Sequence, residues 1–168
     1  MTPQAAAGIG AGAVLAGGTG IGAYMIATSS SNPVTLEEYL KREDLKENNK
    51  TQYTGTTKLG SEEENRKLLV ADVKENESWW NDRFKKYKPE NSGKLDVAES
   101  DEFKGVTKGY GAEATTALNK VCDAAYQKDK ASFKDTGNTV NSDSTQSKSK
   151  RDVEKFCTLK GTGSLKVT

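Results

Sequence analysis

The first 27 residues constrain this chain more than any other feature, because no charged side chain occurs between Ala5 and Ala27. All 25 basic and 24 acidic side chains follow that stretch. A helix of its length would rise about 34 Å, and the hydrocarbon core of a bilayer is about 30 Å thick. We therefore expect residues 1–28 to form a transmembrane anchor or a signal segment.

The composition of this stretch makes membrane insertion marginal. It holds seven glycines and eight alanines, and glycine is a poor helix former. The pairs Gly8/Gly12 and Gly18/Gly22 have the four-residue spacing that lets two membrane helices approach closely, which predicts weak self-association. A cleaved signal peptide and a buried helix of a soluble domain are the alternatives, although no Lys or Arg precedes the apolar run as a signal peptide requires.

The rest of the chain is polar and has the size of one domain. We expect a linker over residues 29–34 and a small helical domain over 35–168. Apolar residues make up 33% of the chain, against a usual 45–50%, so the core should be thin. A net charge of +1 gives no field that would attract nucleic acid. The absence of histidine excludes Ser-His-Asp and Cys-His catalysis and Cys₂His₂ zinc sites, so no enzyme activity, metal or cofactor is expected.

Capping patterns place the first two helices of the domain. A hydroxyl at Thr35 with Glu38 three residues later predicts a helix from about residue 36 to 46. Ser61 with Glu64 predicts a second, long helix to about residue 88, ended by Pro89. Its apolar residues share one face at 100° per residue: Leu69, Val73, Trp80, Phe84 and Tyr87.

The second half of the chain is less regular. Residues 112–130 and 151–157 have helical apolar spacing, whereas residues 48–60 suggest a loop or short strand and residues 95–111 are ambiguous. Residues 134–150 are almost wholly polar, so we expect a flexible loop there.

Cys122 and Cys157 each fall on an apolar helical stripe, and the polar loop joins the two stripes. Outside the cytoplasm the two thiols could oxidise. A disulfide would close a loop of 36 residues and stabilise the fold by about 3–4 kcal/mol. Two buried free thiols in a cytoplasmic domain are the alternative.

Aromatic and basic residues are interspersed from Trp79 to Lys88. Such a run could form a nucleic-acid surface. The same spacing suits a core stripe with a solvated basic face, and we favour the core.

Three features together resemble a known group of proteins. They are the Gly/Ala-rich apolar start, the Trp80-x-x-x-Phe84-x-x-Tyr87 helix, and Cys122 followed by the late Val153-x-x-Phe156-Cys157-Thr158 segment. The chain resembles the short paralogous proteins of haemotropic mycoplasmas, although many of those have Trp where this chain has Phe156. The resemblance implies a membrane-anchored or exported surface protein and no catalytic activity.

The expectation is therefore a mainly α protein with an N-terminal transmembrane helix and a small helical domain with long polar loops. We expect a single-pass, non-catalytic protein of the cell membrane whose C-terminal domain lies outside the cell. Its partners would be the lipid bilayer and a host surface protein, with no nucleic acid, and it would serve host interaction or antigenic display. The alternative is a secreted or cytoplasmic-side binding module for a protein or nucleic acid.

Overall fold

The computed structural model describes residues 32–134 and 143–168. All the regular elements within these residues are short helices, and strand-like pairing there is limited to isolated bridges. The bounds of the helices follow in chain order: α1 Leu36–Leu40, α2 Glu47–Thr54, η1 Leu59–Ser61, α3 Glu63–Leu68, η2 Lys74–Asn76, α4 Glu77–Tyr87, α5 Asp101–Lys104, α6 Leu118–Tyr126, η3 Lys130–Phe133 and α7 Thr145–Cys157. The prediction of a mainly helical domain is confirmed.

The predicted fold class is corrected, because the described residues contain no transmembrane helix. No helix in the described part of the chain is long and apolar enough to cross a membrane. Even α7, with 13 residues, rises only about 20 Å, whereas a span needs about 30 Å. The stretch Ala5–Ala27, with Gly8, Gly12, Gly18 and Gly22, lies outside the described residues.

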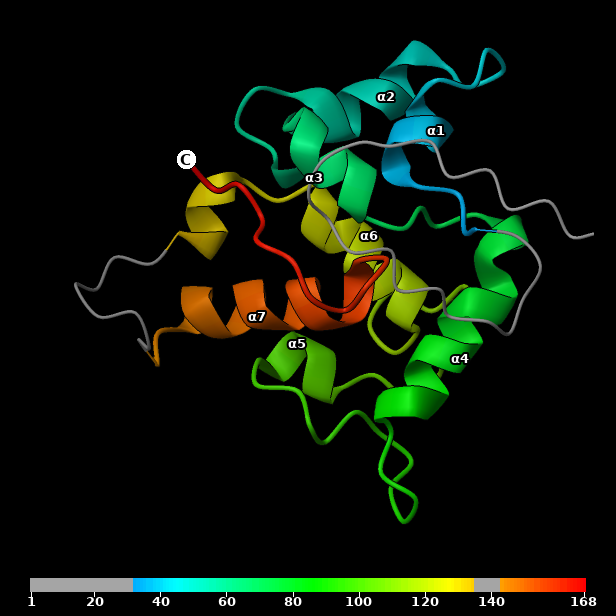
Figure 1. The fold of residues 1–168 in the computed structure, drawn as a ribbon, viewed down its shortest axis with the longest axis vertical. Helices are drawn as coiled ribbons and strands as arrows, with labels where there is room; N and C mark the ends of the chain where they lie inside the picture. The colour runs from blue at the N-terminus through cyan, green and yellow to red at the C-terminus, as the bar shows by residue number, and fades with distance from the viewer. Residues whose placement is uncertain (1–31, 135–142) are drawn as a thin grey trace, which may run out of the picture.

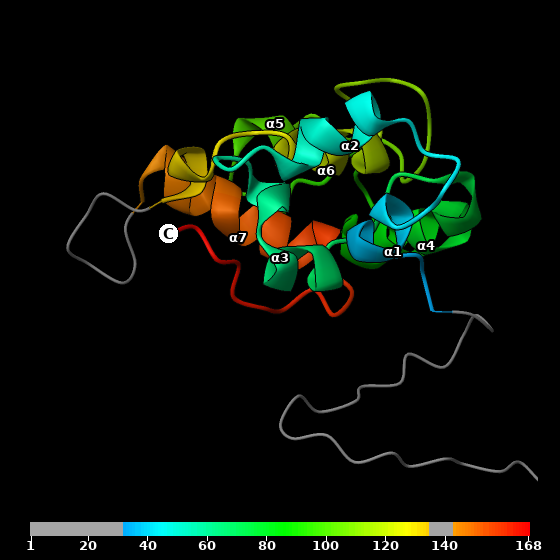
Figure 2. The same cartoon turned by 90° about the horizontal axis from the view of Figure 1, so that it is seen from above.

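The helices pack around one core (Figure 1), and the view from above separates them into two layers (Figure 2). Seen from above, α2, α5 and α6 lie on one side, and α1, α3, α4 and α7 lie on the other (Figure 2). The core between them runs from Leu36 to Leu165 along the chain and includes Trp80, Phe103 and Phe156. The final segment returns along α7 and α3, so the end of the domain also belongs to its core.

One of the two predicted capping boxes is present. The backbone N–H of Glu38 donates to Thr35 Oγ1 at 3.2 Å, and the N–H of Thr35 donates to Glu38 Oε2 at 2.8 Å. The helix it opens is shorter than predicted and ends at Leu40. The second box is wrong, because Ser61 Oγ donates to the carbonyl of Lys58 at 2.7 Å and caps no helix.

The long helix predicted from residue 61 to 88 is broken in two. Between α3 and η2 the chain is extended, and Leu69, Val70 and Ala71 are all fully buried. Their backbone groups form hydrogen bonds with other segments of the chain. Val70 N–H donates to the carbonyl of Cys157 at 3.0 Å, and Leu36 N–H donates to the carbonyl of Leu69 at 2.8 Å. Three consecutive buried residues cannot share one face of a helix, so tertiary packing overrides the capping pattern here.

Two segments predicted as loops are helical. Residues 47–54 form α2 within the predicted loop or strand over 48–60. Helix α7 begins at Thr145, inside the predicted flexible loop over 134–150, and Ser144 Oγ caps it by accepting from Ser147 N–H at 3.1 Å. The helix predicted over 112–130 is shorter and spans only α6.

The predicted disulfide joins the two layers. Cys122 of α6 and Cys157 of α7 are bonded, with their Cα atoms 5.6 Å apart and no exposed surface. Beside the bond, the hydroxyl of Tyr126 donates to the carbonyls of Val70 at 2.9 Å and Cys157 at 3.2 Å. One buried cluster therefore connects α6, α7 and the extended segment after α3.

Arg83 of α4 closes the C-terminal end of α7. The residue is 4% exposed, and its guanidinium donates to the carbonyls of Thr158 at 2.8 Å, Leu159 at 2.7 Å and Lys155 at 3.2 Å. The last carbonyls of a helix lack partners within it and bind cations well. The chain turns after this helix at Gly161, whose φ of 67° is strained for residues with a side chain. Glycine is also needed for space, because a Cβ atom at this position would lie 2.4 Å from Arg83 Nη1.

Replacing both cysteines with alanine should lower the free energy of unfolding by about 3–4 kcal/mol, because the unfolded chain regains the entropy of the opened loop. Urea unfolding monitored by tryptophan fluorescence measures this change. Urea unfolding of the unchanged protein in the presence of a reductant serves as the control and should give a loss of similar size. Unchanged stability in both would contradict a structural role for the bond.

Arg83→Met should destabilise the domain by about 2–4 kcal/mol, because it leaves buried carbonyls without donors. Lys85→Met on the exposed face of the same helix is the matched control and should change stability by less than about 0.5 kcal/mol. Equal effects of the two substitutions in urea unfolding would show that Arg83 has no special role.

Candidate binding groove

A groove of about 600 Å³ lies where α6, η3 and the beginning of α7 meet. Its volume falls within the range of about 300–1,000 Å³ usual for small-molecule sites. The side chains that line it are mostly polar: Gln127 and Lys128 at the end of α6, Ser132 on η3, and Thr145, Gln146 and Ser149 on α7. Lys58, Glu102 and Asp129 complete its polar rim, and Phe133 lies beneath it, 2% exposed.

The backbone around the groove is held on both sides. Leu59 N–H donates to the carbonyl of Lys128 at 2.9 Å, and Lys130 N–H donates to the carbonyl of Thr57 at 2.7 Å. These two bonds fix the segment before η1 against the end of α6. The disulfide fixes α7 against α6 from within, so both long walls of the groove rest on the core.

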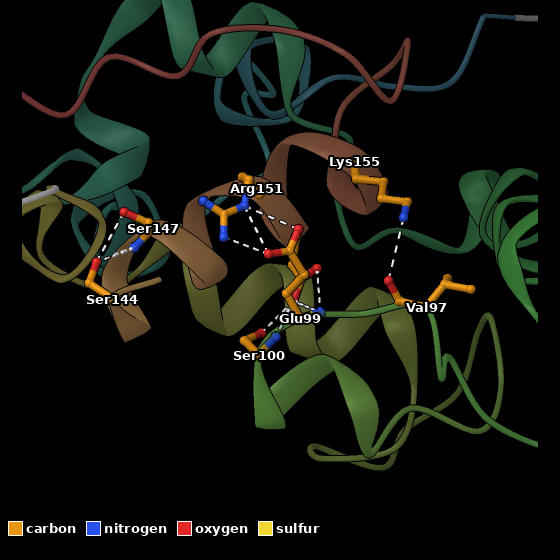
Figure 3. Close-up of polar contacts among 8 residues, drawn as sticks. Val97, Glu99, Ser100, Ser144, Ser147, Arg151 and Lys155 are labelled. Carbon is orange, nitrogen blue, oxygen red and sulfur yellow. Dashed lines mark hydrogen bonds and ion pairs between the residues drawn. The ribbon is translucent and has the colours of Figure 1, made fainter. Parts of the chain in front are cut away.

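The face of α7 turned toward α5 is also held (Figure 3). The buried carboxylate of Asp152 accepts from the N–H of Ser100 at 2.7 Å, from its hydroxyl at 2.6 Å, and from the N–H of Glu99 at 3.0 Å. Burial raises the pKa of Asp152, and the hydrogen bonds from Ser100 oppose that rise. Around it, Arg151 pairs with Glu99 at 2.5 Å, and Lys155 Nζ donates to the carbonyl of Val97 at 3.5 Å.

The charged side chains of the groove are paired with one another. Lys58 lies 3.2 Å from Asp129, and Lys128 forms an ion pair with Glu102. Thr57 also donates its hydroxyl to Asp129 at 2.5 Å. The pKa of Asp129 is lowered by this hydrogen bond and then by Lys58. Each cation at the rim therefore has its own carboxylate, and the four charges cancel.

Gln127 is oriented from behind by a chain of hydrogen bonds. The hydroxyl of Tyr53 donates to Asp123 Oδ1 at 2.6 Å, and Gln127 Nε2 donates to Asp123 Oδ2 at 2.8 Å. Burial raises the pKa of Asp123, and the bond from Tyr53 opposes the rise. The pKa of Tyr53 is also raised, chiefly by its burial. Because the amide nitrogen of Gln127 is held by Asp123, its carbonyl oxygen remains available to a ligand.

A second, smaller pocket of about 250 Å³ adjoins the groove. Glu102 and Lys128 line both spaces, and the pocket is otherwise formed by Ala114, Thr115, Val121 and Ala124. Its wall is therefore mainly small and apolar, in contrast to the polar groove on the other side of the ion pair.

The residues predicted from the sequence to be important lie in different parts of the molecule. Cys122 and Cys157 are brought together in the core between α6 and α7, whereas the four glycines lie outside the described residues. The aromatic stripe is core, as favoured: Trp80 is fully buried and Phe84 is 8% exposed. Trp79 is half-buried, with the Arg83 guanidinium 4.4 Å from its ring centroid.

The groove itself was not predicted, because three of its residues fall in the segment assigned to a flexible loop. The one available signal was Ser144, a good N-cap residue directly before the helix. Over residues 32–134 and 143–168, no group of three or more Cys, Asp or Glu side chains is placed to hold a metal ion.

Comparison of the chain with family models, curated proteins and solved structures finds no match. The resemblance to the haemotropic mycoplasma proteins therefore stays a hypothesis, and the groove is interpreted from its own chemistry.

The raised pKa of Asp123 predicts a pH-dependent stability. A carboxyl group with a raised pKa adds stability that is fully present below its ordinary pKa, about 3.9, and is lost as the pH rises through the raised value. The stability of the unchanged protein relative to Asp123→Asn should therefore fall as the pH is raised from 3 toward 7. Urea unfolding at several pH values measures the difference.

Asp129→Asn is the control of opposite sign. The pKa of Asp129 is lowered, so its contribution is present above the ordinary pKa and is lost as the pH falls. The same trend for both substitutions would show that burial of Asp123 is not the cause.

Proposed function

We propose that this chain is a non-catalytic binding domain that works outside the cytoplasm, with the groove at α6, η3 and α7 as its contact site. The observation that carries the proposal is the buried Cys122–Cys157 pair. The expected partner is a molecule on a host surface, in keeping with the resemblance to exported proteins of haemotropic mycoplasmas.

The position of the two cysteines supports a site of action outside the cytoplasm. Disulfides persist in oxidising compartments and are rare in the cytosol of ordinary cells. These are the two cysteines of the chain, and both take part in the bond between α6 and α7. A domain with a thin core gains a large share of its stability from such a bond.

The groove supports binding rather than catalysis. The chain has no histidine for proton transfer near neutral pH. Asp129 has a lowered pKa and a lysine partner, so it is a poor proton acceptor. Hydroxyl and amide groups supply the uncharged part of the polar lining, and such groups recognise a ligand without activating it.

The state of the cysteines in the producing cells tests this proposal. Cells are lysed in denaturant with an alkylating agent, and the protein is digested with trypsin without reductant. The peptides 121–128 and 156–160 each carry one cysteine and should be recovered joined to one another. Recovery of both as separate alkylated peptides would contradict the proposal, because it would place the domain in a reducing compartment. A second sample reduced before alkylation is the control and must yield the separate peptides.

A further inference from the structure

The groove contains several polar side chains whose hydrogen-bonding capacity is unused. The hydroxyls of Ser132, Thr145 and Ser149 and the amide of Gln146 line it. None of these four side chains has a hydrogen-bond partner within residues 32–134 and 143–168, and the carbonyl oxygen of Gln127 is likewise unused there. By contrast, every buried side-chain nitrogen and oxygen in the described residues is satisfied. The polar groups that line the groove can therefore form hydrogen bonds with a ligand without giving up a partner within the fold.

The chemistry of these groups selects a kind of ligand. A hydroxyl and a carboxamide can each donate and accept a hydrogen bond, and sugar hydroxyls do the same. The charges at the rim cancel, since Lys58 is paired with Asp129 and Lys128 with Glu102. An anionic ligand would have to displace a carboxylate from its lysine, so a neutral ligand fits better.

A peptide ligand fits less well. Peptides are commonly bound by an exposed strand edge, by an apolar groove for a helix, or by a cluster of arginines for a phosphate. The described part of the chain has no strand beyond isolated bridges. The residues that line the groove are polar or charged apart from Phe133, and none of them is an arginine.

The adjoining pocket narrows the choice further. It opens beyond the Glu102–Lys128 pair and is lined by Ala114, Val121 and Ala124. Its mainly apolar wall admits an apolar group attached to a polar ligand, and its volume of about 250 Å³ leaves room for the whole substituent. The methyl of an N-acetyl substituent is such a group, and its amide would complement the carboxamides of Gln127 and Gln146.

We propose that the groove and its adjoining pocket bind a neutral oligosaccharide that carries N-acetyl groups. The sugar hydroxyls would bond to Ser132, Thr145, Gln146 and Ser149, directly or through water. An acetamide methyl would enter the pocket beside Val121. This inference rests on the proposed role of the domain in binding, and it adds the class of ligand.

Titration of the purified, oxidised full-length chain with three trisaccharides tests the inference. Triacetylchitotriose has the proposed chemistry, cellotriose lacks the acetamides, and chitosan trimer replaces them with ammonium groups. Binding is measured by calorimetry and by chemical-shift changes of the groove amides. Triacetylchitotriose should bind and shift the amides of residues 127–132 and 145–149, and the other two should bind at least about tenfold more weakly.

Variants connect the binding to the groove. Gln146→Ala with Ser149→Ala removes two unused polar groups from α7 and puts a good helix former at both positions. It should weaken binding about tenfold, since each lost hydrogen bond costs a few-fold in affinity. Gln52→Ala with Ser78→Ala is the matched control, one Gln and one Ser on the exposed faces of α2 and α4, and it should leave binding unchanged.

Several results would overturn the inference. They are no binding of triacetylchitotriose at 10 mM, equal binding of cellotriose, equal loss in the control variant, or groove shifts caused only by a neutral tripeptide such as trialanine. Because the purified protein is oxidised beforehand, these outcomes do not depend on where the domain resides in the cell. A failure here therefore leaves the cysteine test of the proposed function intact.

Discussion

The bond between Cys122 and Cys157 is the constraint on which the rest of this structure depends. It joins the most buried helix of one layer to the longest helix of the other, at a point with no solvent exposure. Tyr126 lies beside it and donates to carbonyls from two further segments. The bond thereby helps to hold α7 against α6, and α7 forms one wall of the groove and one side of the core.

In a fold made of such short helices, many backbone N–H and C=O groups have no hydrogen-bond partner within a helix. Buried polar side chains provide partners for some of these groups. Asn65 donates to the carbonyls of Leu59 and Lys166, each at 2.9 Å, and accepts from the N–H of Lys166. Asn76 likewise donates to the carbonyls of Val34 and Ala71 and accepts from the N–H of Val34. These side chains act as connectors between segments far apart in the sequence. A small apolar core can therefore hold an irregular chain, because the cost of burying backbone groups is offset locally.

The groove is formed by the same two helices that the disulfide connects. Its walls come from α6 and α7, while its lining carries polar groups that the fold does not use. Gln127 shows the connection, since the Tyr53–Asp123 pair behind it holds its amide nitrogen. A rigid framework with unused hydroxyls and amides suits recognition of a polar ligand better than chemical change.

Local patterns predicted some elements well and failed at others for a consistent reason. Thr35 caps a helix as its pattern indicates, because that cap is satisfied within four residues. Ser61 matches the same pattern but caps no helix. Its hydroxyl donates to the carbonyl of Lys58 instead, and the chain after α3 is extended rather than helical. The apolar spacing from Trp80 to Phe84 was sufficient to place α4 against the core. The spacing from Leu69 to Val73 was misleading, since that segment pairs with Cys157 and Leu36.

By itself the sequence determined the helical character of the domain, the one possible partner of each cysteine and the absence of histidine chemistry. Each of these depends on composition, on local periodicity or on there being one possible pair. The tertiary structure decided where the helices end, that residues 145–150 are helical, and that polar side chains from α6, η3 and α7 meet in one groove. Those features depend on contacts between residues far apart in the chain, and such contacts leave no periodic signal in any one segment.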